Sequence, residues 1–309
     1  MIIDFHTHVY PPKQAAAPRW QGRCPMTIEN VLAAQERHGV DISVISNHTP
    51  YMRHSEPDPI LAEHREINKY LAEQQHKHSG KIYALACSVP NDRDDYLNEL
   101  ERAVKVDGMK GVMIRASHQH AYPDDDSAKP FFKLCCDLDV PVVMHPPPVG
   151  FGEERMKDYR LASSVGRPAD NCLALARLIV RGIFEEFPKL KLVATHLGGG
   201  ICEVIGRMNY AYTMQEEAFF LGSYEPMLIE HEPLHYLKMC YLDTVCYHLP
   251  AACCVVESVS ADRVIFGTDA PPLTAIKGKG LQMIYDLGLA PQDQEKILSG
   301  NARQLLKLG

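Results

Sequence analysis

The sequence lacks the features that mark membrane, secreted and nucleic-acid-binding proteins. None of its 309 residues lies in an apolar run of 18 or more, so no membrane span is expected. It has no basic block, and 32 basic against 39 acidic side chains give a net charge of −7, which leaves no electrostatic footprint for nucleic acid. The start of the chain has neither the basic segment nor the apolar core of a signal peptide. We therefore predict a cytoplasmic protein without membrane or nucleic-acid partners.

Cysteine is present, but its spacing does not indicate a metal or redox motif. None of the ten cysteines belongs to a Cys-x-x-Cys sequence, and the adjacent pairs at 135–136 and 253–254 lie in apolar helical patterns. Free cysteine packs as a small hydrophobic residue in a reducing compartment. We predict buried structural thiols, including Cys87, Cys172 and Cys246.

Short apolar runs alternate with amphipathic helical segments along the whole chain. Nearly continuous apolar runs are typical of strands buried on both faces. Eight strands are predicted, at residues 2–5, 42–46, 82–89, 111–114, 140–144, 190–194, 241–245 and 264–266.

The intervening segments carry helix start and stop signals. Thr27 can cap a helix that ends near Gly39, and Asp58-Pro59 opens another that ends near residue 80. Further helices are predicted at 95–106, 173–187, 201–219, 251–258, 281–287 and 292–308, the last of them broken at Gly300.

Eight strand–helix repeats in about 300 residues predict the α/β class and a (β/α)8 TIM barrel that forms a single domain over residues 1–309. An open, doubly wound sheet is the alternative, but no Gly-x-Gly-x-x-Gly follows a predicted strand. Long connections at 9–26, 47–57 and 146–167 follow predicted strands, which is the catalytic side of a barrel.

Histidine and aspartate side chains stand at the ends of four predicted strands. His6 and His8 end the first strand at i and i+2, so their side chains point the same way. His145, His196 and Asp269 end the fifth, sixth and eighth strands. The carboxyl ends of barrel strands meet at one mouth, and imidazole and carboxylate groups bind divalent ions there. These residues predict a metal site.

Two other His-x-His pairs show that this spacing alone means little. His76 and His78 lie in a predicted helix, where positions i and i+2 diverge by about 200°, so we interpret them as a solvated helix end. His118 and His120 follow the fourth strand and either contact substrate or lie in a surface loop.

The strand-end residues lie within motifs that resemble the amidohydrolase superfamily. The resemblance runs from His6-Thr7-His8 to Asn301-Ala302 and is densest between residues 155 and 272. Its motifs are VGRPA at 165–169, GIFEEFPKLK at 182–191, HLGGG at 196–200 and GTD at 267–269. Together they resemble the branch that includes 2-amino-3-carboxymuconate 6-semialdehyde decarboxylase and related decarboxylases and hydrolases.

The resemblance implies roles at the matching positions. His6, His8, His145 and Asp269 would ligate one divalent ion, zinc foremost with manganese as the alternative. His196 would be the acid/base that holds the water activated by the metal, with a place as a fifth ligand left open. Asp269 would act as a proton carrier as well as a ligand.

Two arginines are predicted to contact an acidic small-molecule substrate. Arg207 matches an arginine that the family decarboxylase lends to the neighbouring subunit's site, which implies a homodimer or larger homo-oligomer. Arg115 ends the fourth strand, where superfamily members with two metals often have lysine, and this favours one metal. Burying an unpaired guanidinium in the outer apolar layer would cost several kcal/mol, so we expect Arg115 at the mouth. The alternative is a salt bridge to an acid at 124–126.

The resemblance supports two reaction classes. The favoured one is metal-dependent decarboxylation of a small unsaturated or aromatic carboxylic acid, with metal-activated water and His196 as acid/base. The alternative is metal-dependent hydrolysis of a cyclic amide, lactone or β-diketone. The family decarboxylase has a substrate-binding arginine at the start of its first helix, whereas residues 24–30 here contain none. The particular substrate therefore does not carry over.

Overall fold

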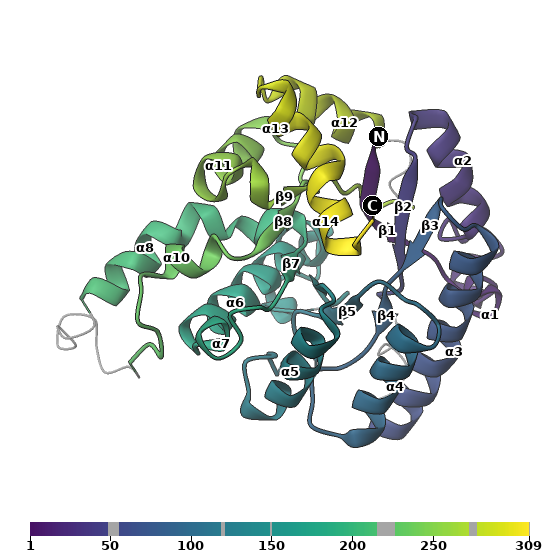
Figure 1. Ribbon diagram of the computed structural model, residues 1–309, viewed down its shortest axis with the longest axis horizontal. Coiled ribbons are helices and arrows are strands. Elements are labelled where there is room, and N and C mark those ends of the chain that lie inside the picture. The colour runs from purple at the N-terminus through teal and green to yellow at the C-terminus, as the bar shows by residue number, and fades with distance from the viewer. Residues whose placement is uncertain (49–55, 119–120, 149, 215–225, 272–276, 309) are drawn as a thin grey trace.

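Strands and helices alternate along the chain (Figure 1). The computed structural model describes residues 1–48, 56–118, 121–148, 150–214, 226–271 and 277–308. The strands are β1 (Ile3–His8), β2 (Ile42–Ser46), β3 (Ile82–Ala84), β4 (Ala86–Cys87), β5 (Val112–Arg115), β6 (Val142–His145), β7 (Leu192–Ala194), β8 (Tyr241–Asp243) and β9 (Val264–Ile265).

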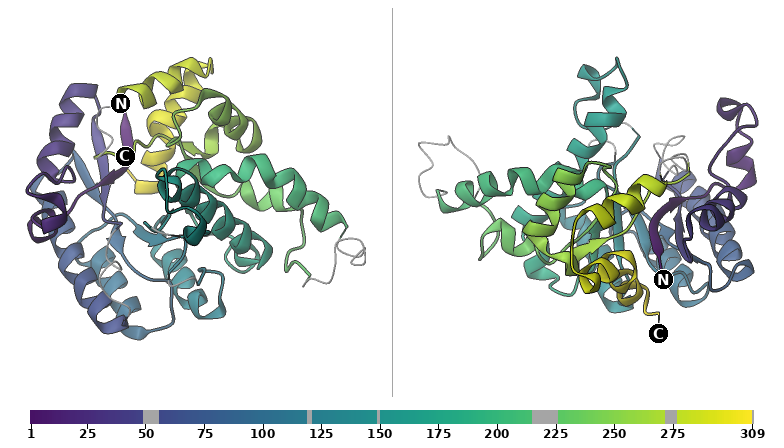
Figure 2. Two further views of the ribbon diagram at one scale, coloured as in Figure 1. Left: turned by 180° about the vertical axis from the view of Figure 1, so that it is seen from behind. Right: turned by 90° about the horizontal axis from the view of Figure 1, so that it is seen from above.

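Helices surround these strands in the views of Figure 1 and Figure 2. In the first half of the chain they are α1 (Pro12–Ala15), α2 (Ile28–His38), α3 (Pro57–Lys77), α4 (Asp94–Lys105), α5 (Lys129–Leu138), α6 (Arg167–Val180) and α7 (Ile183–Glu186). They continue with α8 (Ile201–Thr213), α10 (Pro233–Leu237), α11 (Leu249–Val259), α12 (Lys277–Asp286), α13 (Pro291–Glu295) and α14 (Asn301–Leu306).

All strand pairs are parallel, in the orders β1-β2-β3 and β4 through β9. The predicted strand at 82–89 is two short pieces, and Leu85 between them donates its N–H to the Ile45 carbonyl at 2.9 Å. The first strand also bonds to the residue that follows β9, because Phe5 N–H donates to the Phe266 carbonyl at 2.9 Å. This parallel α/β order confirms the predicted fold class.

An irregularity in β1 decides which side chains face the barrel axis. Asp4 pairs with Ser43 but Thr7 pairs with Ile45, so β1 has one residue more than β2 in this interval. Such a bulge changes the side-chain alternation. Phe5 therefore packs in the apolar interior, and the very next residue, His6, also turns inward, where its ring contacts Asp243 of β8.

An apolar layer fills the end of the barrel interior that α14 covers. It joins side chains of successive strands to the C-terminal helix α14, which lies across the strands in Figure 1. The layer consists of Ile3, Phe5, Ile42, Val44, Leu85, Met113, Val143, Val193, Tyr241, Ile265, Ala302, Leu305 and Leu306. A second, larger cluster packs the outer strand faces against the surrounding helices. At about 25 cal/mol per Å² of apolar area, such burial is the main favourable contribution to folding.

Several helix boundaries differ from the sequence pattern. Thr27 caps α2 as predicted, since its Oγ1 accepts the Asn30 N–H at 3.4 Å. The segment predicted as one helix at 173–187 is two, α6 and α7, because Gly182 has φ 72° and interrupts the helix. The predicted break at Gly300 is wrong: a π-helical turn (Lys296–Gly300) connects α13 to α14. The helix predicted to residue 219 ends at Thr213, and residues 215–219 lie outside the described ranges.

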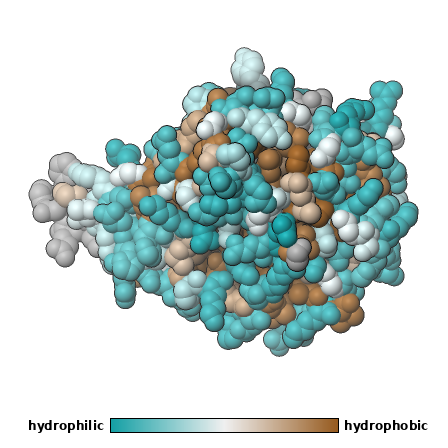
Figure 3. Space-filling model, turned by 45° about the horizontal axis from the view of Figure 1, so that its top comes forward, coloured by the Kyte–Doolittle hydropathy of each residue, from teal (hydrophilic) through white to brown (hydrophobic). Residues whose placement is uncertain are grey.

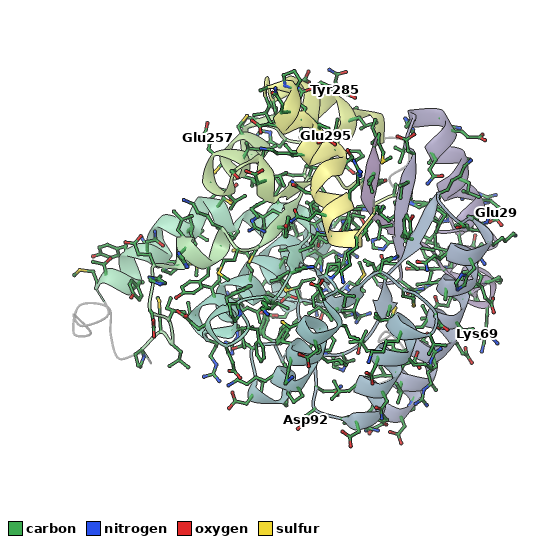
Figure 4. All side chains as sticks on the ribbon, viewed as in Figure 1. Glu29, Lys69, Asp92, Glu257, Tyr285 and Glu295 are labelled. Atoms are coloured by element: carbon green, nitrogen blue, oxygen red, sulfur yellow. The ribbon has the colours of Figure 1, made fainter. Side chains whose placement is uncertain are left out.

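The outer surface is largely polar. Hydrophilic residues predominate on the face shown in Figure 3, and the labelled Glu29, Lys69 and Glu257 lie at the periphery in Figure 4. Across the described ranges, no helix has the length and apolar character needed to cross a membrane. All ten cysteines are free, and most are buried or half-buried. Cys246 departs from the predicted burial, because it lies exposed in the turn that follows β8.

Candidate functional site

The two histidines of β1 lie close together in the barrel interior. Both side chains are buried, and their Nε2 atoms are 3.1 Å apart. His6 Nδ1 donates to Asp243 Oδ2 at 2.6 Å, because a carboxylate can only accept. His8 Nδ1 is 3.1 Å from Ser46 Oγ, whose own proton goes to the Thr7 carbonyl. Both Nδ1 atoms are thus engaged, which leaves both Nε2 atoms available.

His145 and Asp269 complete the group from β6 and from the turn after β9. His145 Nδ1 donates to the Pro146 carbonyl at 2.8 Å, and its buried Nε2 has no hydrogen-bond partner among the residues that the structure describes. Asp269 Oδ1 lies 2.9 Å from His8 Nε2 and 3.4 Å from His6 Nε2. The structure therefore brings together all four predicted ligands.

This donor set fits one divalent ion. One ligand atom from each of His6, His8, His145 and Asp269 lies within 4.8 Å of the others. Three Nε2 atoms with their Nδ1 atoms held elsewhere, plus a carboxylate, form a set that zinc and manganese both accept. The orphaned His145 Nε2 points to the same conclusion, since an unpartnered buried polar atom costs about 1–3 kcal/mol.

The electrostatics of the group favour a cation. Burial opposes protonation of His6, but the Asp243 hydrogen bond and nearby carboxylate charges outweigh it, so the pKa of His6 is raised. Burial and the charges of neighbouring histidines, His8 first, hold the pKa of His145 well below its usual range, so its ring is neutral. Contacts with His196 and His8 overcome burial and hold the pKa of Asp269 well below its usual range. His145 and Asp269 are thus held in the forms that bind a metal, neutral imidazole and ionised carboxylate, and the carboxylates that favour a proton on His6 would favour a metal cation in its place.

His196 lies at the edge of this group. Its ring centroid is 5.3 Å from that of His145, and its Nε2 is 3.7 Å from Asp269 Oδ2. His196 and Asp269 both have positive φ, 57° and 54°. Non-glycine residues with positive φ are uncommon, and such strain persists where the surrounding structure holds it in place.

Sequence reasoning missed Asp243. It ends β8 and is buried; besides His6, it accepts the backbone N–H of His196 at 2.7 Å through Oδ1. One carboxylate thus orients a predicted ligand and the predicted acid/base. The signal was an acid at a strand end, but the predicted strand ran to residue 245 and placed Asp243 inside it.

His48, two residues beyond β2, was also missed. Its ring centroid lies 4.3 Å from that of His8 and 5.1 Å from that of His145. Only a lone histidine after a strand marked it in the sequence, which is a weak signal.

The remaining candidates occupy different places. Arg115 ends β5 in register with His145, and its Nη2 donates to the His48 carbonyl at 2.9 Å. Arg207 is exposed on α8. His118 lines a cavity beside Arg115, whereas His120 lies outside the described residues.

The three acids of the alternative have other partners: Asp124 pairs with Arg177 at 2.8 Å, Asp126 pairs with Lys129 at 3.2 Å, and Asp125 accepts the Ser127 N–H at 3.0 Å. The described group that could hold a metal includes neither His76 nor His78.

Comparison with known proteins supports the predicted family. The chain is 27% identical over 276 residues to a 2-amino-3-carboxymuconate-6-semialdehyde decarboxylase of Dictyostelium discoideum, covering 88% of this chain and 74% of the relative. Its fold matches a 5-carboxyvanillate decarboxylase from Sphingomonas paucimobilis with a TM-score of 0.87 and 19% identity, over 100% of this chain and 99% of the other. It also matches a manganese-bound dihydroxybenzoic acid decarboxylase from Polaromonas with a TM-score of 0.84 and 21% identity, over 99% and 97%.

The sequence profile of the Amidohydrolase family matches residues 3–308, nearly the whole chain. That span runs from the first residue of β1 to beyond α14, and it includes every residue of the His6, His8, His145 and Asp269 group. The chain therefore belongs to the Amidohydrolase family.

Proposed function

We propose that this protein is a metal-dependent decarboxylase of a small unsaturated or aromatic carboxylic acid. The observation that carries the proposal is the convergence of three Nε2 atoms and the Asp269 carboxylate on one point, with His196 at its edge. Decarboxylases among the relatives and the matched folds support this reaction over hydrolysis.

His6, His8, His145 and Asp269 would hold one divalent ion. When bound, the ion would polarise a carboxylate or carbonyl oxygen of the substrate. The donor chemistry favours zinc, and the manganese in the Polaromonas structure makes manganese the alternative.

His196 is assigned the proton transfer. Decarboxylation breaks the bond between the carboxyl group and the adjacent carbon, and the electron pair stays on that carbon. His196 Nε2, beside Asp269 Oδ2, is placed to deliver the proton that this carbon takes up. After this transfer, Asp269 can relay a proton from solvent back to His196, which fits its proposed double role. The His196 backbone is fixed through Asp243, so the ring is pre-oriented.

Arg115 is assigned to an acidic or enolate oxygen of the substrate. Its Nη2 donates to the backbone carbonyl of His48, whose ring lies beside those of His8 and His145, and this supports a place near the metal-site residues. A planar guanidinium matches a carboxylate with two parallel hydrogen bonds, which lysine cannot reproduce. Arg115→Lys should therefore raise KM while leaving the unfolding temperature nearly unchanged.

The protein is further proposed to be a cytoplasmic homodimer or larger homo-oligomer with one domain per chain. Arg207 is exposed on α8 between the exposed apolar residues Val204 and Tyr210, a surface suited to a second subunit. Free cysteines fit a reducing compartment. The use of both β1 and α14 in one apolar layer supports a single domain.

The test is carbon dioxide release from a panel of hydroxylated benzoic acids and carboxymuconate-type acids by the metal-loaded protein, with incorporation of ¹⁸O from labelled water measured in parallel. The proposal predicts carbon dioxide without stable ¹⁸O incorporation into the organic product. Labelled product from amides or lactones, with no carbon dioxide from any acid, would establish the hydrolase alternative instead.

A further inference from the structure

A buried hydroxyl lies directly before the proposed acid/base. Thr195 follows β7 and is fully buried, and its Oγ1 is 2.9 Å from Nδ1 of His196. The same oxygen is 3.0 Å from the Met144 carbonyl of β6 and 3.0 Å from Nδ2 of Asn171, a buried residue of α6. Polar groups from two strand ends and one helix thus meet at a single hydroxyl, beside the ring of His196.

The amide of Asn171 donates to Thr195. Its Nδ2 is 2.9 Å from the backbone carbonyl of Thr195, an oxygen that accepts hydrogen bonds and has no proton to give. The amide nitrogen, which carries two protons, must therefore face this carbonyl and the hydroxyl beside it. Asn171 thus occupies one of the two lone pairs of Thr195 Oγ1.

The proton of the Thr195 hydroxyl goes to β6. A hydroxyl has one proton and two lone pairs, and a carbonyl oxygen can only accept. Oγ1 therefore donates to the Met144 carbonyl, because a proton turned toward His196 would leave two oxygen atoms facing each other at 3.0 Å with no proton between them. The second lone pair of Oγ1 faces Nδ1 of His196, so this nitrogen must carry a proton and donate it.

We propose that Thr195 is a positioning residue that fixes the tautomer of His196. The hydroxyl holds a proton on Nδ1 throughout the reaction, so Nε2, 3.7 Å from Asp269 Oδ2, is the atom that gives its proton to the substrate carbon and regains one afterwards. This inference rests on the proposed function, in which His196 is the acid/base. Without the hydroxyl, each proton delivery would leave the Nδ1–H group without its acceptor, which disfavours the transfer.

The tautomer can be measured without catalysis, by ¹⁵N NMR of the histidine-labelled, zinc-loaded full chain. With the ring neutral, His196 should show a protonated, pyrrole-like Nδ1, and the His196→Asn variant identifies its signals by their absence. Thr195→Val keeps the shape and removes the hydroxyl, so the Nε2–H tautomer should appear, since the Asp269 carboxylate then offers the nearer acceptor. An unprotonated Nδ1 in the wild type, or an unchanged tautomer in Thr195→Val, would overturn the inference.

Steady-state kinetics give the second readout. Thr195→Val should lower kcat about 10- to 100-fold with KM and metal content unchanged, and Thr195→Ser, which restores the hydroxyl, should recover most of the rate. Thr213→Val is the matched control, because Thr213 is exposed at the end of α8 and its hydroxyl donates to the Asn209 carbonyl at 3.1 Å. It should keep the wild-type tautomer and rate.

The two readouts separate this inference from the proposed function. A Thr195→Ser rate as low as that of Thr195→Val would overturn the role of the hydroxyl, even in an active decarboxylase. If the zinc-loaded protein releases no carbon dioxide from any acid but its tautomer changes as predicted in Thr195→Val, the proposed function fails and the positioning of His196 by Thr195 stands.

Discussion

Two layers fill the barrel interior, and the same strands supply both. At the end covered by α14, Val143 of β6 and Tyr241 of β8 pack in the apolar layer. Two residues further along those strands, His145 and Asp243 belong to the polar layer at the mouth. The right-hand view of Figure 2 shows both termini on one side of the barrel and the segment after β6 projecting from the opposite side.

The difference shows how stability and chemistry are separated along each strand. The apolar layer buries side chains that need no partners, so it contributes to folding directly. The polar layer holds the unpartnered His145 Nε2 and the positive φ angles of His196 and Asp269. Such features cost free energy and persist where the surrounding packing holds them. Substitutions in the mouth layer should thus change function, and those in the apolar layer should change stability.

Removal of two ligands should have the largest effect. We expect the double variant His6→Ala/His8→Ala to hold less than about half an equivalent of metal, because two of the four donors are gone. Decarboxylation should fall to background. Elemental analysis after purification without chelators measures this.

The matched control is His76→Ala/His78→Ala, a second His-x-His pair at the end of α3. It should keep about one equivalent. Unchanged metal content in the His6/His8 variant would contradict the assigned site.

Loss of His196 should be next in size. His196→Asn should lower kcat by roughly 10²- to 10⁴-fold, the usual contribution of general acid–base catalysis, while the metal stays bound. Steady-state kinetics and metal content on the same sample measure both quantities. A near-normal rate would refute the acid/base role, and loss of metal would make His196 a fifth ligand.

A substitution in the apolar layer should lower stability and leave metal binding and catalysis unchanged. Leu305 is 2% exposed on α14, and Leu305→Ala should lower the free energy of unfolding by about 2–5 kcal/mol through lost burial and a cavity. Metal content and KM should not change. Denaturant titration gives the stability, and Val106→Ala, at a side chain 74% exposed, should stay within about 0.5 kcal/mol of wild type. A normal stability combined with impaired metal binding in Leu305→Ala would contradict the assignment of stability to the apolar layer and of metal binding to the polar layer.

Asp243 should give the smallest of these effects. Asp243→Asn keeps the shape but removes the charge that orients His6 Nδ1, so metal affinity should fall about 10- to 100-fold. Competition with a chelator of known affinity measures it. An affinity equal to that of wild type would show that Asp243 does not support the ligands.

The sequence predicted the candidate ligands of the polar layer better than the residues and backbone features that hold them in place. Apolar runs predict where strands end, and a histidine or aspartate just beyond such a run is easily recognised. His145, His196 and Asp269 were predicted in this way. Asp243 was missed because a strand's last residue cannot be separated from its apolar neighbours to within two positions. The bulge in β1 has no local sequence signal, since it depends on pairing with β2. The interruption at Gly182 was missed because apolar periodicity continues across it.

The central claim is that one divalent ion at this mouth supports decarboxylation. The most direct measurement is a titration of metal-free protein with zinc or manganese, with carbon dioxide release from the best acid of the panel as the readout. We predict no release without metal and a linear rise that stops at about one equivalent per chain. Release by the metal-free protein, or a rise that continues to two equivalents, would contradict the account.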